Sequence, residues 1–198
     1  MTRMRIAALA IALAALSGCV APVGPVEVTR FHVPDATPLG HGTITVEPAP
    51  GVDGNALEFR SYAEAVARQL VLLGYAEQSP GSTSNQVALV RIERGSFRQA
   101  RAGGPVSVGV GGSTGSYGSG VGLGIGIDLS GPPPEQVETR LSVTIRDRAS
   151  GMALWEGRAS FTVRASSPLA TTQLGAAKLA EALFKGFPGN SGETIHVQ

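Results

Sequence analysis

Cysteine is almost absent from this chain: Cys19 is the only one among 198 residues. A single thiol cannot close an internal disulfide, so the folded part must be stabilised by its core. The three histidines, His32, His41 and His196, stand far apart, and none has the spacing to a second ligand that a zinc site needs. We therefore expect no metal site and no cofactor.

Lysine is also scarce, and cations do not exceed anions by enough to attract a polyanion. Lys178 and Lys185 are the only lysines, and the formal net charge is +1. Nucleic-acid binding is not expected, because it depends on a basic surplus that neutralises phosphates. A phosphate-binding P-loop is excluded as well, because no lysine follows the glycine-rich segment as that motif requires.

Long hydrophobic runs are missing too, apart from one at the amino terminus. Arg3 and Arg5 precede the apolar stretch 6–16, and small residues follow it. Such a run extends about 16 Å as a helix, roughly half of the hydrocarbon core of a membrane. The pattern of charged, apolar and small regions is typical of a signal peptide, which we place at residues 1–18.

The end of this segment, Leu16-Ser17-Gly18-Cys19, resembles the bacterial lipobox. The resemblance implies cleavage between Gly18 and Cys19 and a diacylglycerol thioether on Cys19. Two or more acyl chains hold a protein firmly on a bilayer. The alternative is an ordinary signal peptide with a chance cysteine. We expect the membrane to be a partner through lipid on Cys19, with residues 19–25 as a short tether rich in proline and glycine.

Residues 26–198 have the size and pattern of one α+β domain. Strands are predicted at 26–33, 43–47 and 86–94, and the alternation over 140–163 predicts a hairpin. Apolar steps of three and four predict a helix over 56–73, closed by Gly74, and a second helix that opens at Ser167 with Pro168 in its first position. Residues 194–197 are predicted as an edge strand. This order favours an antiparallel sheet with two helices packed on one face.

Residues 103–131 differ in composition and are predicted to form a glycine-rich hairpin insertion. Apolar residues alternate with glycine or serine, which leaves one face nearly bare. Three roles remain open: a flexible insertion packed on the domain, a bare surface that a partner approaches closely, or a membrane contact beside the lipid. If a partner binds, the expected contact residues are Tyr117, Val121, Leu123 and Ile125.

Catalysis is not expected, although two patterns offer an alternative. Gly111 to Gly115 surrounds Ser113 as a nucleophile elbow would, and Asp128 and His196 follow in hydrolase order, but no helix-forming run follows the serine. Four arginines between Arg91 and Arg101 form a cationic run that either faces solvent or binds an anionic ligand. The alternative function is a small-ligand-binding or hydrolytic module that uses a cleft near Ser113 or this run.

Several motifs together resemble the lipoprotein family known as domain of unknown function 4136. They are the lipobox, the run from Leu57 to Tyr62 that leads into a helix, the Leu72-Leu-Gly-Tyr75 motif at the end of that helix, the hairpin from Leu141 to Gly157, and the closing segment 187–192. The resemblance implies a bacterial envelope lipoprotein with no established activity. By the lipoprotein sorting pattern, Val20 after the cysteine favours the outer membrane. We therefore expect a periplasm-facing, lipid-anchored binding or structural module, with an envelope protein as its possible partner.

Overall fold

The computed structural model describes residues 24–35, 39–99, 106–115, 118–127 and 131–198. Its elements, in chain order, are β1 (Val26–His32), β2 (Thr43–Pro48), α2 (Leu57–Leu72), β3 (Ala76–Glu77), β4 (Gln86–Phe97), β5 (Val106–Gly115), β6 (Gly118–Ile127), β7 (Gln136–Asp147), β8 (Ala153–Arg164), the 3₁₀ helix η1 (Pro168–Ala170), α3 (Thr172–Phe184) and β9 (Thr194–Val197).

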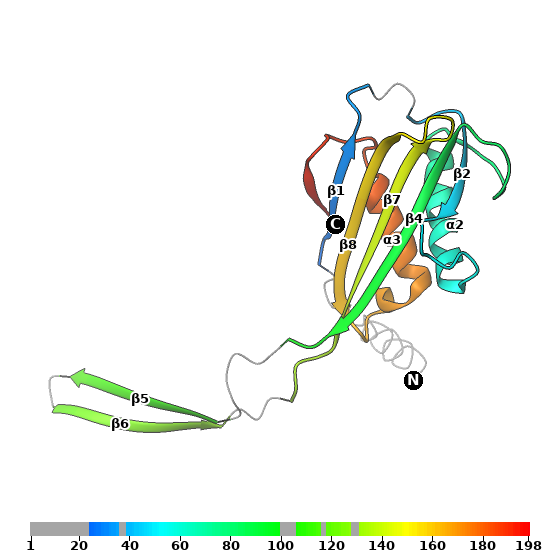
Figure 1. Cartoon of the computed structure of the whole chain (residues 1–198). Coiled ribbons are helices and arrows are strands. Elements are labelled where there is room, and N and C mark those ends of the chain that lie inside the picture. Colours follow the sequence, from blue (N-terminus) through cyan, green and yellow to red (C-terminus); the bar gives the residue numbers. More distant parts are fainter. Residues whose placement is uncertain (1–23, 36–38, 100–105, 116–117, 128–130) are drawn as a thin grey trace, which may run out of the picture.

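Seven strands form one sheet in the order β3-β2-β4-β7-β8-β1-β9, and both helices cover the same face of it (Figure 1). The predicted α+β class with two helices on one face is confirmed. The sheet is mostly antiparallel, but β2 pairs in parallel with β3 and with β4. These parallel pairs arise because the chain passes through α2 after β2 and returns in the same direction.

The core lies between the sheet and the helices. β7 and β8 form the predicted hairpin, and alternate residues of each strand face the helices and are buried. Trp155 is the largest of them, and its ring stacks on Phe184 with 5.4 Å between centroids. Its indole nitrogen donates to the carbonyl of Pro188 at 3.0 Å, so the closing segment of the chain is held against the core.

Helix α2 follows its predicted stripe, with Phe59, Tyr62, Val66 and Leu70 buried. Gly74 ends it with φ of +105°, and a Cβ there would lie 2.6 Å from the carbonyl oxygen of Gly40. Glycine is therefore required by both the backbone conformation and the close approach.

The second helix begins later than predicted. Ser167 and Pro168 start the 3₁₀ helix η1, in which the Ser167 hydroxyl accepts from the backbone N–H of Leu169 at 3.3 Å. α3 starts only at Thr172. The capping signal was identified correctly, but Thr171 has extended backbone angles and separates the two helical segments.

The predicted glycine-rich hairpin is confirmed. β5 and β6 pair along their whole length, from Val106 with Ile127 to Gly115 with Gly118, as a two-stranded sheet of their own. Figure 1 shows it apart from the seven-stranded sheet, beyond the ends of β4 and β7. Within the part of the chain that the structure describes, no helix has both the length and the apolar character to cross a membrane.

Candidate functional site

The face of the sheet opposite the helices carries mainly polar side chains. Each central strand places its alternate, non-core residues there, which gives the face a mixture of both charges and hydroxyl groups. These residues include Arg91 and Glu93 on β4, Glu138, Arg140, Ser142, Thr144 and Arg146 on β7, Glu156, Arg158 and Ser160 on β8, and Glu27 and Thr29 on β1. We call this surface the open face.

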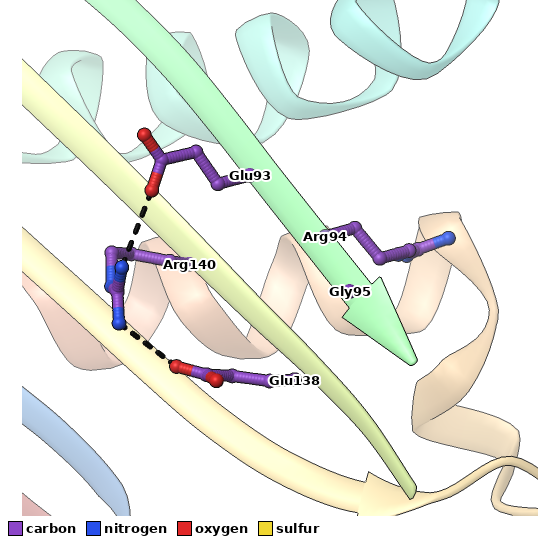
Figure 2. Close-up of a pocket in the computed structure, with 5 residues that line it drawn as sticks. All are labelled: Glu93, Arg94, Gly95, Glu138 and Arg140. Atoms are coloured by element: carbon purple, nitrogen blue, oxygen red, sulfur yellow. Dashed lines mark hydrogen bonds and ion pairs between the residues drawn. The ribbon is translucent and has the colours of Figure 1, made fainter. Parts of the chain in front are cut away.

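A shallow depression of about 240 Å³ lies at the end of the open face, towards the end of β4 and the start of β7. Figure 2 shows Arg140 between Glu93 and Glu138, with nitrogen–oxygen distances of 3.3 and 2.9 Å. Gly95 pairs with Glu138 and offers no side chain, and nothing lies within 4 Å of the position its Cβ would take. The depression therefore results from a missing side chain beside an ion-paired cluster.

This depression does not have the properties of a small-molecule pocket. Ligand pockets typically enclose about 300–1,000 Å³ and are lined mainly by apolar groups. Here the lining is charged, the side chains are roughly half exposed, and both carboxylates already pair with Arg140. Exposed pairs of this kind contribute about 0–1 kcal/mol each, so the cluster is best described as a solvated surface network.

The arginines of the predicted cationic run do not form one patch. Arg91 donates to the carbonyl of Pro50 at 2.7 Å. Arg94 is three residues further along the same strand, so its side chain lies on the opposite face, towards the helices, 3.2 Å from Glu58. Arg98 lies 3.7 Å from Glu135, and Arg101 lies outside the described residues. Strand alternation separates Arg91 from Arg94, so these two arginines do not form a common patch for an anionic ligand.

Arg94 takes part in a polar cluster between the sheet and the helix starts. Its guanidinium lies 3.5 Å from the hydroxyl of Tyr62 and 3.5 Å from that of Thr172. Burial raises the pKa of Tyr62, and the charge and hydrogen bond of Arg94 act in the opposite direction. These contacts join α2, β4 and α3, so their role is to hold the helices on the sheet.

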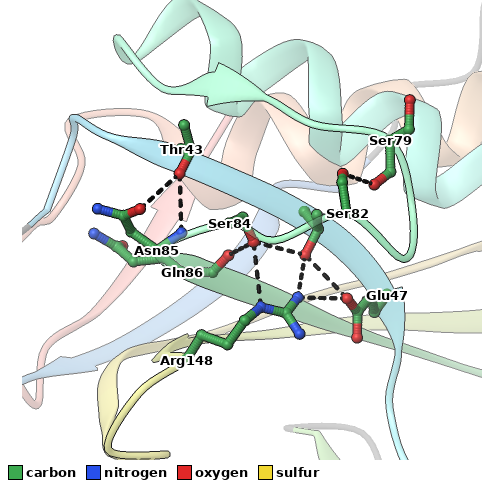
Figure 3. Close-up of polar contacts among 9 residues, drawn as sticks. Thr43, Glu47, Ser79, Ser82, Ser84, Asn85, Gln86 and Arg148 are labelled. Carbon is green, nitrogen blue, oxygen red and sulfur yellow. Dashed lines mark hydrogen bonds and ion pairs between the residues drawn. The ribbon is translucent and has the colours of Figure 1, made fainter.

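A second polar network closes the other end of the open face. Figure 3 shows Arg148, in the β7–β8 turn, reaching Glu47 at 2.5 Å and Ser84 at 3.3 Å. Its Nη2 also lies 2.6 Å from the hydroxyl of Thr45, which is fully buried. The network fixes β2 and the segment before β4 to the β7–β8 turn, and each polar group in it already has an internal partner.

The expected partner-binding residues lie on the hairpin or beside it. Val121, Leu123 and Ile125 are on β6, where they pair with Gly112, Val110 and Val108. Tyr117 lies outside the described residues, as do Gly18 and Cys19.

Ser113 lies inside β5, pairs with Gly120, and is followed by strand β6. An elbow needs a strand-to-helix turn that lifts the serine above a sheet, and this segment does not provide one. His196 is on β9, paired with Glu27 at an edge of the other sheet, and Asp128 lies outside the described residues. The structure therefore does not bring Ser113 and His196 together within one sheet.

Among the described residues, no group of three or more histidine, aspartate or glutamate side chains could hold a metal ion. Sequence reasoning missed the network around Arg148 and the cluster around Arg140. Both depend on contacts between strands that are distant in sequence, and the available signal was the alternation of charged or hydroxyl residues with apolar residues over 140–146.

No family model matches the chain. An uncharacterized protein of Zymomonas mobilis is 28% identical over 215 residues, which covers 88% of this chain and 80% of the relative. A PDZ domain protein from Parabacteroides distasonis has a TM-score of 0.48 at 11% identity, covering 88% of this chain and 39% of its own. A PelC dodecamer from Paraburkholderia phytofirmans has a TM-score of 0.41 at 13% identity, covering 80% and 97%. These similarities assign no activity to the chain.

Proposed function

We propose that the protein is a lipid-anchored module of the bacterial envelope, facing the periplasm from the outer membrane, that binds another protein without catalysing a reaction. The observation that carries the proposal is the lipobox at Cys19 followed so soon by folded structure. β1 begins at Val26, so residues 19–25 can extend at most about 25 Å. A domain on such a tether remains close to the membrane surface.

Two features of the described residues support binding over catalysis. The charged and hydroxyl groups of the Arg140, Arg94 and Arg148 clusters mostly contact one another. They are therefore arranged as structural contacts. The hairpin, in contrast, is a long two-stranded sheet outside the main sheet, and it is the element best placed to meet a partner.

Fractionation of host envelopes tests the anchor. The full-length chain is expected in the outer-membrane fraction, and a Cys19→Ala chain is expected to leave it, because the lipid is the only proposed membrane attachment. If the Cys19→Ala chain fractionates as the unaltered chain does, lipid anchoring through this residue is wrong.

In-cell crosslinking followed by mass spectrometry tests the binding role. Deletion of residues 103–131 is expected to abolish recovery of crosslinked partners. Arg140→Ala is the matched control on the open face, because its side chain is about half exposed and its loss leaves the hairpin unchanged. If Arg140→Ala loses the crosslinked partners while the chain without residues 103–131 recovers them fully, the binding site lies on the open face and not on the hairpin.

A further inference from the structure

The hairpin has two long edges, and the described part of the chain places no other strand beside them. β5 and β6 have ten residues each and pair only with each other in their sheet. Half of the backbone groups of a strand point away from its partner, so each outer edge, about 33 Å long, presents about five N–H and five C=O groups for pairing. Such an edge is a template for another strand.

The main sheet of the same molecule ends differently. Its outermost strands are β3 with two residues and β9 with four. Short edge strands are one of the ways in which proteins prevent edge-to-edge association. The hairpin strands, with ten residues each, are longer than both of these edge strands, so the two sheets of this chain differ in the property that controls strand addition.

The hairpin also lacks the other features that block edges. Residues 102–127 contain no aspartate, glutamate, lysine or arginine, and neither strand contains proline. The register runs from end to end without a bulge. Charges, proline and bulges are the usual protection of an exposed edge, and their absence over both strands indicates an edge that is meant to be paired.

An isolated two-stranded hairpin is at best marginally stable in water, and glycine weakens it further. Its register pairs Val106, Val108 and Val110 with Ile127, Ile125 and Leu123, while the intervening positions pair serine or glycine with glycine. If a neighbouring copy paired beside the hairpin, the apolar pairs and the serine or glycine pairs would both continue across the wider sheet. A third and fourth strand would supply the hydrogen bonds and apolar contacts that two strands lack.

A second copy fits these edges better than a membrane does. Unpaired backbone groups are costly in hydrocarbon, so a single hairpin cannot enter a bilayer before its edges are paired. An uncharged edge also matches an identical uncharged edge without leaving a charge unpaired. Chains held on one membrane by lipid meet at a high effective concentration, which favours weak pairing.

We propose that the β5–β6 hairpins of separate copies of this chain pair edge to edge and join the copies into a continuous sheet. The proposal rests on the proposed function in taking the hairpin as the binding element, and it names the partner as a second copy of the same chain.

Cysteine capture in host envelopes tests the pairing. The full-length chain has one cysteine, Cys19, and its thiol is proposed to carry the lipid. A thiol introduced at Ser113 on β5 or Ser119 on β6 can therefore be addressed with a short bis-maleimide. Crosslinked pairs are expected for one or both positions, either when one cysteine variant is expressed alone or when the two variants are expressed together. Thr162→Cys, an exposed site on β8, is the control and is expected to give none. Equal capture at Thr162, or none at either hairpin position, would overturn the proposal.

A charged pair inside the hairpin separates edge pairing from chance collision. Val108→Lys with Ile125→Glu places opposite charges on residues that face each other, which preserves the hairpin itself. Capture through Ser119→Cys should then fall about tenfold, because the new charges interrupt the row shared between copies. Thr29→Lys with Thr194→Glu makes the same change on a cross-strand pair of β1 and β9 and should leave capture unchanged. The reverse result would assign association to the edge of the main sheet.

A comparison with and without vesicles tests whether the hairpin contacts a membrane instead of a second copy of the chain. A full-length Cys19→Ala chain with Ser119→Cys is crosslinked in buffer, with and without vesicles of host lipid. Equal yields support pairing between copies, and a yield that appears only with vesicles overturns it in favour of the membrane. A Cys19→Ala chain that fractionates as the unaltered chain does, with capture retained here, would contradict the proposed function and leave this inference standing.

Discussion

Trp155 fills the space between β8 and α3, and Gly157 provides part of that space. A Cβ at position 157 would lie 2.2 Å from the Trp155 ring and 2.8 Å from the Leu183 side chain. The glycine is therefore required by packing, and its φ is not in the positive range. Contact at this distance forces side chains to move within a closely packed core.

We predict that Gly157→Ala lowers the free energy of unfolding by about 1–3 kcal/mol, the usual cost of overpacking. Urea denaturation measures it. Gly95→Ala is the matched control, because nothing lies within 4 Å of its Cβ position and the change should stay within about 0.5 kcal/mol. Equal effects of the two substitutions would contradict the packing account.

Arg30 is a buried cation that closes the end of α3. Its guanidinium donates to the carbonyls of Leu183 at 3.0 Å and Ala182 at 3.1 Å. Burial lowers the pKa of Arg30, and the carboxylate of Glu193 acts in the opposite direction. A positive charge at the carboxyl end of a helix is favourable, and the last carbonyls of a helix need partners.

We predict that Arg30→Met lowers the free energy of unfolding by about 2–3 kcal/mol, because it leaves buried carbonyls without donors. Arg30→Lys keeps the charge but loses the two-pronged geometry, so its loss should be smaller. Thermal unfolding of both variants provides the comparison. A methionine variant as stable as the unaltered chain would show that the two hydrogen bonds contribute nothing.

Tyr62 links stability to high pH. Because burial raises the pKa of Tyr62 above its unfolded value near 10, its contribution is complete below that value and is lost as pH rises through the folded pKa. Burial raises the pKa of Tyr75 in the same direction. We predict that Tyr62→Phe makes the alkaline decrease in unfolding free energy less steep, as urea titrations above and below pH 10 will report. If the slope is unchanged, burial of the Tyr62 phenol is not the cause of the alkaline decrease in unfolding free energy.

At the scale of elements, local patterns predicted most of the fold. The β7–β8 hairpin, the buried stripe of α2 and the glycine-rich hairpin each follow from periodicity within a short segment. The parallel pairing of β2 with β4 could not be predicted, because nothing local determines which strands become neighbours. The surroundings of the arginines in the Arg91–Arg101 run could not be predicted for the same reason. Alternation separates Arg91 from Arg94, but which of the two faces the helices depends on the whole sheet.

The hairpin is an element that the main domain does not need for its core. β4 and β7 remain paired up to Phe97 and Gln136, where the chain leaves towards the hairpin. We predict that deletion of residues 103–131 changes the free energy of unfolding by less than about 1 kcal/mol, since loop length alters closure entropy only weakly. Urea denaturation tests this. A large loss of stability would show that the hairpin packs on the domain.

At the scale of the whole molecule, the described residues form a sheet-and-helix body and a separate hairpin, and we propose that a lipid anchor at Cys19 and a short tether precede them. The body presents a charged, solvated open face, and the hairpin presents unprotected edges. In the proposed arrangement, the lipid concentrates copies on one surface and the hairpins join them. The sequence predicts the anchor from a contiguous motif, whereas the role of the hairpin depends on how its strands pair.

Intact-mass analysis of the protein purified from its own host tests the central proposal most directly. We predict a chain that begins at Cys19 and carries the added mass of a diacylglycerol group, with a further acyl chain on the new amino terminus. A mass that retains residues 1–18, or one that corresponds to an unmodified thiol, would contradict the lipid anchor on which the proposed function rests.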